Sequence, residues 1–278
     1  MLTPDMINKI ETFVYQKPRS IQEIASYTRK NWRTVDRYVQ EIQKNFGTIS
    51  TRVFREGTRG ALKIVFWASV EKASNSVFQE KLEEEILTSK KKEDFSAFDI
   101  FQHVDNKTKR AIVEKALDEN STNLKELAEL LQQTKKQLLI FSGNLSLINL
   151  KNKKFDMFKI LEDLVKRNIP IKIIARTDIA GKENIEKALS LNFKYGKELV
   201  EIRHRSHPVR AFVIDNNIFR IKEVKEPTGK IHELDKKVFI YYTIKDKKWA
   251  EWISRIFWKM FSSSINAQKR LEEMKTLK

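Results

Sequence analysis

The sequence predicts a mixed α/β protein (α+β overall), in which a helical first part and an α/β second part are joined by a helical connector. Helical periodicity followed by two β-like runs fills residues 1–72. From Thr122 onward, amphipathic helices alternate with short runs rich in β-branched residues. Such alternation is typical of a sheet covered by helices on both faces. We therefore expect three segments, at residues 1–72, 73–118 and 119–278.

The composition favours a polyanionic partner. The chain has 278 residues, of which 41% are hydrophobic and 33% charged, so it can bury a core. Its 54 Lys and Arg exceed its 37 Asp and Glu, which gives a formal charge of +17. An excess of this size makes nucleic acid the expected partner, ahead of a membrane surface.

Several classes of site and location are excluded or disfavoured. The absence of Cys excludes disulfides, thiol catalysis and Cys-based zinc sites. With only four His, we expect no metal and no cofactor. The first residues lack the basic and apolar regions of a signal peptide, and the apolar stretch at residues 137–150 is too short to span a bilayer. We expect a cytoplasmic protein that does not engage a membrane.

Capping signals divide the first segment into three helices. Thr3 and the following proline start the first, and Ser20 with Glu23 forms a capping box for a short second one. Asn31 caps a third, which runs to about Phe46. Two β-like runs follow at residues 49–54 and 61–67, which predicts a hairpin.

The third helix has the pattern of a DNA-reading element. Val35, Val39 and Ile42 share one face, and the other face carries Arg33, Thr34, Arg37 and Gln40. Residues 20–42 resemble the winged helix-turn-helix family, and the hairpin, with Arg55 and Arg59 near its tip, resembles the wing. The resemblance implies that the segment binds double-stranded DNA, with the four helix residues touching bases or phosphates and the two wing arginines gripping the backbone. The alternative is an interaction module whose basic face is merely solvated.

The remaining elements follow from periodicity. We expect a solvated helix over 73–92, short helices over 95–104 and 107–117, and a frayed tail over 268–278. A long helix begins at Lys247, and its apolar face, which includes Trp249 and Trp252, is either core or a dimer patch. Strands are expected at residues 137–141, 169–175, 199–203, 209–214, 218–221 and 238–244.

Three stretches resemble a phospholipase D-like domain: residues 135–143, residues 161–174, and the run from His207 to Asp215. A winged helix followed by such a domain is similar to archaeal transcription regulators of the TrmB-like type. In that family the second domain serves as ligand sensor and dimeriser. The resemblance therefore implies a homodimeric transcription regulator with a small-molecule effector.

The catalytic motif of the phospholipase D superfamily is His, any residue, Lys, four residues, then Asp. When Asp215 is aligned, Arg210 takes the Lys position and Pro208 the His position, with His207 displaced by one residue. A slip of one residue turns a strand side chain to the other face. We expect a degenerate site without catalysis. The alternative is a nuclease or phosphodiesterase that uses the winged helix to find DNA.

A ligand pocket is expected beyond the strand ends. Arg176 follows a predicted strand, and ligands of open α/β sheets lie beyond the carboxyl ends of strands. With Asn144 and Arg210 it would line a small-molecule site. The preferred function is a DNA-binding transcription regulator; a further alternative is a non-catalytic adaptor that binds protein or membrane phosphates.

Overall fold

The first three helices begin at the residues that the sequence marks as caps. In the computed structural model, which describes residues 2–55, 61–68, 75–115, 122–152, 155–227 and 237–276, Thr3 caps α1 (Pro4–Gln16). Ser20 and Glu23 form the predicted capping box of α2 (Ile21–Thr28), since each side chain accepts a hydrogen bond from the other's backbone N–H. The Asn31 side chain accepts from the N–H of Arg33 at 2.8 Å at the start of α3 (Trp32–Asn45).

A three-stranded antiparallel sheet completes the first part. Its order is β1-β3-β2, with β1 at Arg19–Ser20, β2 at Ile49–Arg55 and β3 at Ala61–Trp67. Strands β2 and β3 form the predicted hairpin, in which Ile49 pairs with Trp67 and Arg55 with Ala61. The tip of the hairpin, with Arg59, lies outside the described residues.

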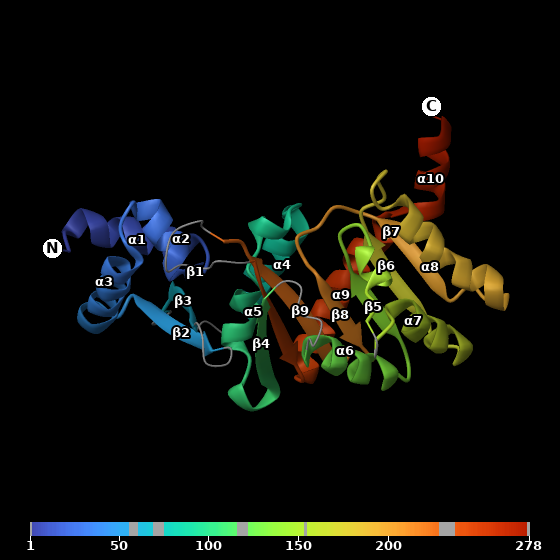
Figure 1. Ribbon diagram of the computed structural model, residues 1–278, viewed down its shortest axis with the longest axis horizontal. Coiled ribbons are helices and arrows are strands. Elements are labelled where there is room, and N and C mark those ends of the chain that lie inside the picture. Colours follow the sequence, from blue (N-terminus) through green and yellow to red (C-terminus); the bar gives the residue numbers. More distant parts are fainter. Residues whose placement is uncertain are drawn as a thin grey trace.

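The second part is built on an eight-stranded sheet in the order β11-β7-β6-β5-β8-β9-β10-β4 (Figure 1). Strands β5, β6 and β7 run parallel, and every other neighbouring pair is antiparallel. The strand bounds are β4 Lys109–Lys115, β5 Leu138–Phe141, β6 Ile171–Ala175, β7 Val200–His204, β8 Ala211–Ile214, β9 Ile218–Lys225, β10 Val238–Ile244 and β11 Ile265–Asn266.

Helices cover both faces of this sheet, as the alternating sequence predicts. One face packs against α4 (Asn75–Thr88), α5 (Ala97–His103) and α9 (Lys247–Ser262). The other packs against α6 (Thr122–Gln132), α7 (Met157–Lys166), α8 (Lys182–Tyr195) and α10 (Ala267–Thr276). Short 3₁₀ helices occur at η1 (Lys92–Asp94), η2 (Asn106–Thr108) and η3 (Ser146–Asn149). The predicted α/β fold class is confirmed.

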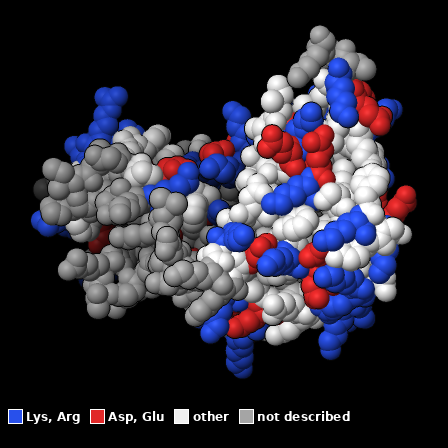
Figure 2. Space-filling model, turned by 45° about the vertical axis from the view of Figure 1, so that its right-hand side comes forward, with Lys and Arg blue, Asp and Glu red and all other residues white. Residues whose placement is uncertain are grey.

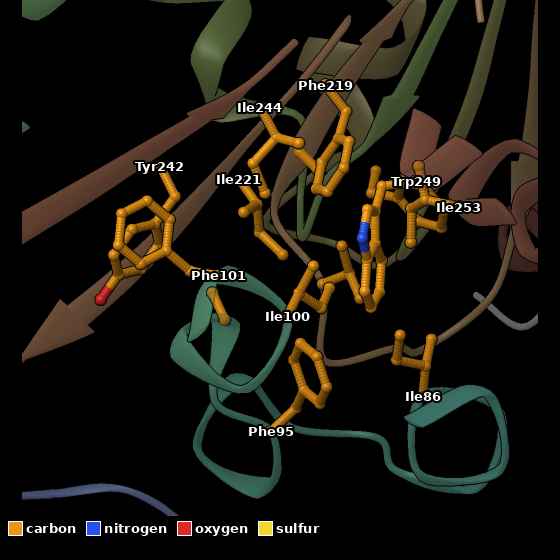
Figure 3. Packing of buried hydrophobic residues seen from close by; sticks show 14 of the residues in the cluster. Ile86, Phe95, Ile100, Phe101, Phe219, Ile221, Tyr242, Ile244, Trp249 and Ile253 are labelled. Carbon is orange, nitrogen blue, oxygen red and sulfur yellow. The ribbon is translucent and has the colours of Figure 1, made fainter. Parts of the chain in front are cut away.

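One apolar core continues from the hairpin of the first part into the second. Phe54 of β2 is buried, and its ring lies 6.1 Å from those of Phe98 and Tyr242. Figure 3 shows the neighbouring layer, in which Phe101 and Ile100 of α5 face strands β9 and β10 while Trp249 and Ile253 project from α9. The apolar face of α9 is therefore core, and the first part packs directly on the large sheet.

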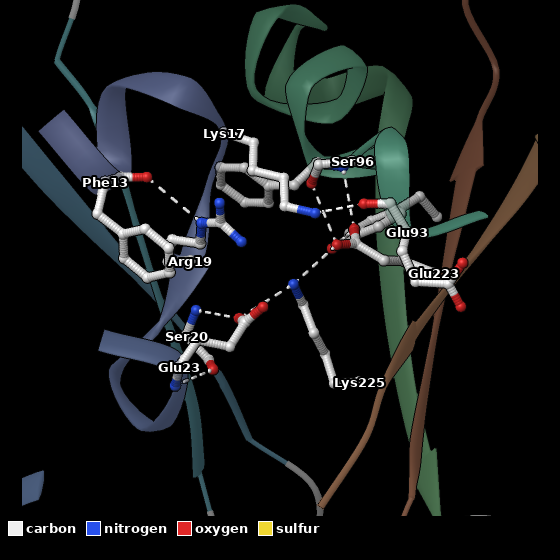
Figure 4. Close-up of polar contacts among 11 residues, drawn as sticks. Phe13, Lys17, Arg19, Ser20, Glu23, Glu93, Ser96, Glu223 and Lys225 are labelled. Atoms are coloured by element: carbon white, nitrogen blue, oxygen red, sulfur yellow. Dashed lines mark hydrogen bonds and ion pairs between the residues drawn. The ribbon is translucent and has the colours of Figure 1, made fainter. Parts of the chain in front are cut away.

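A buried polar cluster joins α2 to the same strand, β9 (Figure 4). The Lys225 amino group lies 3.3 Å from Glu23 Oε2 and 3.1 Å from Glu223 Oε1. Glu223 also accepts hydrogen bonds from the Ser96 hydroxyl and the Phe98 N–H. Burial opposes ionisation of Lys225, but Glu223 and Glu23 outweigh it and raise the pKa of that amino group. The junction is thus both apolar and charged.

Two local predictions are wrong. Residues 107–117 were expected to be helical, yet Lys109–Lys115 forms strand β4 and pairs antiparallel with β10. The edge of the sheet supplies backbone partners for Ile112 and Val113, and tertiary pairing of this kind overrides local periodicity. The tail expected to fray forms α10 up to Thr276, because Leu271 is buried against the core.

Among the described residues, no helix combines the length and apolar composition that crossing a membrane requires.

Candidate nucleic-acid interface and ligand cavity

Helix α3 presents the predicted residues to solvent. Arg33, Arg37 and Gln40 are exposed and Thr34 is half-buried. The opposite face packs into the core of the first part through Val35, Tyr38, Val39 and Ile42, all buried. In Figure 1, α3 lies at the end of the molecule opposite to α8 and α10, so the large sheet leaves this face open.

The two arginines of α3 are free to take an external anion. Among the described residues neither guanidinium forms an ion pair, and each lies near the aromatic ring of its neighbour in sequence. Gln40 differs, because its amide donates to Asp36 Oδ2 at 2.9 Å. Asp36 in turn pairs with Lys63 of β3 at 2.5 Å, and no sequence signal marked this link.

Of the two arginines expected in the wing, the structure describes only the backbone of Arg55. Arg55 ends strand β2, but its side chain and the whole of Arg59 lie outside the described residues. The positive charge of the chain is not confined to this end of the molecule. Figure 2 shows Lys and Arg spread over the visible face of the second part, with acidic residues between them.

A cavity of about 830 Å³ lies against strands β8, β9 and β10, on the sheet face that α6 borders. Its lining is apolar and basic, and Glu114 is the single acidic residue among the described residues that form it. The basic residues are Lys92, Lys151, Arg176, Arg210, Arg220, Lys222 and Lys237, and the aromatic ones are Phe141, Phe212, Phe239 and Tyr241.

The three residues predicted to line a ligand site meet at this cavity. Asn144 follows β5, Arg176 follows β6, and Arg210 precedes β8, which runs antiparallel to β5. Strands β5 and β6 therefore end, and strand β8 begins, at the same end of the sheet. The backbone links two of the loops, since the Arg176 N–H donates to the Gly143 carbonyl at 2.5 Å.

Arg210 is fixed against the loop that follows β5. Its guanidinium donates to the carbonyl oxygens of His207 and Val209, at 3.1 and 2.7 Å. A Cβ at Gly143 would lie 2.9 Å from Arg210 Nη2, so glycine is needed for this approach. Burial, and then the charge of Arg176, lower the pKa of Arg210 from its usual value.

Lys222 was not predicted as a site residue, because single lysines on strands carry no distinctive signal. Its amino group lies 3.8 Å from the centre of the Phe239 ring. Burial, together with the charges of Lys92, Lys237 and Arg210, lowers the pKa of Lys222 to about 8.

The three residues expected to form a degenerate catalytic motif do not share one site, although Arg210 contacts the backbone of His207. His207 is buried, its Nε2 lies 3.2 Å from the Ile174 carbonyl oxygen, and it does not line the cavity. Burial and the charge of Arg210 lower the pKa of its imidazole to about 3. Asp215 lies at the far end of β8, where its carboxylate accepts hydrogen bonds from the N–H groups of residues 135–137. Four strand residues separate Arg210 from Asp215.

No protein-family model matches the chain. No curated protein matches it either. Among solved structures, it is similar to the phospholipase D family member Nuc of Salmonella typhimurium, with 14% identity, a TM-score of 0.40, and coverage of 57% of this chain and 97% of that one. It is also similar to NucT of Helicobacter pylori, with 13% identity, a TM-score of 0.37, and coverage of 57% and 99%.

A similarity that extends over more of the chain is to TrmBL2, an archaeal chromatin protein described with a novel mode of DNA binding. The identity is 16% and the TM-score 0.37, and the match covers 94% of this chain and 93% of that one.

A second cavity of about 1090 Å³ lies at the C-terminal end of α5, near α9. Its lining mixes basic with acidic residues: Arg52, Lys107, Lys109, Lys248 and Arg255 with Asp105, Asp246 and Glu251. Within the described residues, no group of three or more His, Asp and Glu side chains is placed to hold a metal ion.

Proposed function

We propose that this protein is a DNA-binding transcription regulator whose first part, residues 1–72, is a winged helix-turn-helix domain. The observation that carries the proposal is the exposed face of α3, where the Arg33 and Arg37 side chains lack an acidic partner among the described residues. Arginine suits this role because its guanidinium binds phosphates and the purine edges of the major groove.

The surroundings of α3 support the same proposal. The helix follows a short helix and a tight turn, and a hairpin lies beside it, which is the arrangement of a winged helix. Asp36 is the acidic residue nearest the two arginines in sequence, and its carboxylate is engaged by Lys63 and Gln40. The negative charge of Asp36 is therefore partly neutralised by Lys63 and does not compete for the two arginines. Arg55 and Arg59 remain proposed backbone contacts of the wing.

We further propose that the cavity of the second part is the site of a small-molecule effector, lined by Asn144, Arg176 and Arg210. In this proposal the motif residues His207, Arg210 and Asp215 have no catalytic role, because Asp215 lies at the other end of β8 from Arg210 and the His207 imidazole is buried. Residues 73–118 and 119–278 then serve sensing and assembly rather than catalysis.

Fluorescence anisotropy of labelled duplex fragments, read at two salt concentrations, tests the DNA-binding proposal. We expect one fragment to bind at least about 10³-fold tighter than competitor DNA. We also expect a log–log salt slope near −0.9 for each phosphate contacted. A homodimer would require two half-sites about 10 base pairs apart, or a multiple of that. Equal affinity for every fragment would contradict the role of a specific regulator.

A further inference from the structure

Three cations of the cavity beside β9 form no ion pair with a carboxylate of the described residues, and one of them, Lys151, is exposed to solvent. The other two, Arg210 and Lys222, are half-buried; the Arg210 guanidinium contacts backbone carbonyls and the Lys222 amino group contacts an aromatic ring. The remaining cations differ, because each has an acidic partner within 4 Å: Lys92 and Lys237 pair with Glu226, Arg220 with Glu126, and Arg176 with Asp178.

Withdrawing a charge from water costs free energy unless an opposite charge accompanies it. Two such cations in one cavity would compensate that cost by binding an anion. We infer that the cavity binds a phosphorylated small molecule, with its phosphate held between Arg210 and Lys222 and its apolar body against the aromatic wall formed by Phe212, Phe239 and Tyr241. This inference specifies the ligand of the effector site proposed above and rests on that proposal.

A phosphate group fits the two cations better than a single negative charge does. Arginine offers a planar fork of donors, and lysine adds a compact point charge, so together they match a dianion with several acceptor oxygens. The guanidinium of Arg210 is also pre-positioned. Two carbonyl oxygens hold its Nη1, and the absence of a side chain at Gly143 lets it lie against the loop after β5.

The apolar wall explains why an inorganic anion alone would be an incomplete ligand. Phe239 and Tyr241 project from β10, and Leu124 and Leu127 of α6 line the same cavity. Its volume of about 830 Å³ lies within the range of ordinary small-molecule sites, roughly 300–1,000 Å³. A ligand with a ring and a phosphate, of the size of a nucleotide, would use both features.

The pKa of the Lys222 amino group should change when a ligand occupies the cavity. Its pKa is lowered to about 8 by burial and by the charges of Lys92, Lys237 and Arg210. A bound phosphate adds negative charge beside the amino group and so favours its protonated form. Ligand binding is therefore expected to raise the pKa of Lys222 towards that of an ordinary lysine.

Isothermal titration calorimetry on the full chain, without DNA, tests the inference. The probes are adenosine monophosphate, adenosine and inorganic phosphate, and the proteins are the wild type, Lys222→Met and Lys248→Met. Methionine retains the length of the lysine side chain but not its charge. Lys248 is exposed and lines the other cavity, so its variant controls for a general loss of positive charge.

We expect adenosine monophosphate to bind the wild type and the control variant alike, and more tightly than adenosine or phosphate. Lys222→Met should weaken that binding by about tenfold or more, as expected for a lost charge-assisted contact. Equal affinity in Lys222→Met and the wild type would overturn the inference, as would the absence of binding at millimolar ligand. Equal binding of phosphate and adenosine monophosphate would contradict the role of the aromatic wall.

A second readout separates ligand contact from a structural effect of the substitution. After reductive ¹³C-methylation of the lysines, NMR titration with pH follows each amino group. Saturating adenosine monophosphate should raise the pKa of Lys222 and leave that of Lys248 unchanged. Because both experiments omit DNA, they fail or succeed independently of whether α3 reads DNA.

Discussion

Lys222 and Lys225 lie three residues apart on β9, so their side chains leave opposite faces of the strand. Lys222 lines the cavity, whereas Lys225 enters the polar cluster that holds α2 through Glu23. One strand therefore separates the proposed ligand site from the junction with the proposed DNA-binding domain. Any shift of β9 on ligand binding would act directly on that junction.

Removing the charge of Lys225 should destabilise the protein. Lys225→Met leaves Glu223 and Glu23 without their cation, and breaking a buried pair in this way costs about 3 kcal/mol. Urea denaturation at pH 7 measures the loss. The double variant Lys225→Met/Glu223→Gln should recover part of the stability, because it removes one stranded charge. A loss no greater than that of the exposed control Lys248→Met would show that the cluster contributes nothing.

Two neighbouring residues of the hairpin, one buried and one exposed, test the apolar contact between the first part and the large sheet. Phe54 is 8% exposed and packs against α5 and β10, whereas its neighbour Val53 is 43% exposed on the other face of β2. Phe54→Ala should cost about 3 kcal/mol of unfolding free energy, as for other buried aromatic residues. Val53→Ala should change it by less than about 0.5 kcal/mol. Similar losses in thermal or urea unfolding would mean that the hairpin does not pack as described.

Stability should fall as the pH drops from 7 to 5, in part through His207. Its imidazole has a pKa of about 3 in the folded chain, so between the ordinary value of 6.5 and that pKa the unfolded chain binds the extra proton. The cost reaches about 2 kcal/mol at pH 5. His207→Leu should flatten the dependence of the unfolding free energy on pH over this range. An unchanged slope would show that the imidazole titrates normally.

The same buried imidazole predicts that the chain does not hydrolyse DNA through His207. Supercoiled plasmid incubated with the protein in the presence of a metal chelator should remain intact. Nicking that disappears in His207→Ala but persists in Lys248→Met would support the nuclease alternative instead.

The sequence predicted the elements whose signals are local. Caps at Thr3, Ser20 and Asn31 start helices as expected, and β-branched runs form the strands of the central sheet. Strand β4 was missed because its partner, β10, is more than a hundred residues away in the chain and local periodicity does not record it. α10 was missed because its charged sequence hides one buried side chain, Leu271.

The candidate sites were predictable to different degrees. The outward face of α3 follows from helical spacing, and the meeting of Asn144, Arg176 and Arg210 follows from strand order at a sheet edge. Lys222 and Lys225 were not found, since their importance arises from which charges surround them. The hydrogen bond from the Gln40 amide to Asp36 likewise depends on side-chain geometry, which the spacing of residues along the helix does not determine.

The DNA affinity of a variant that loses only the outward arginines of α3 tests the proposed DNA contact most directly. Anisotropy titrations at one salt concentration would compare the wild type, Arg33→Ala/Arg37→Ala, and the control Arg255→Ala, which removes an exposed arginine of α9. We expect the α3 variant to lose about tenfold or more in affinity, with a smaller salt slope and unchanged thermal stability. The control should bind as the wild type does. Equal affinity of all three proteins would contradict the claim that α3 reads DNA.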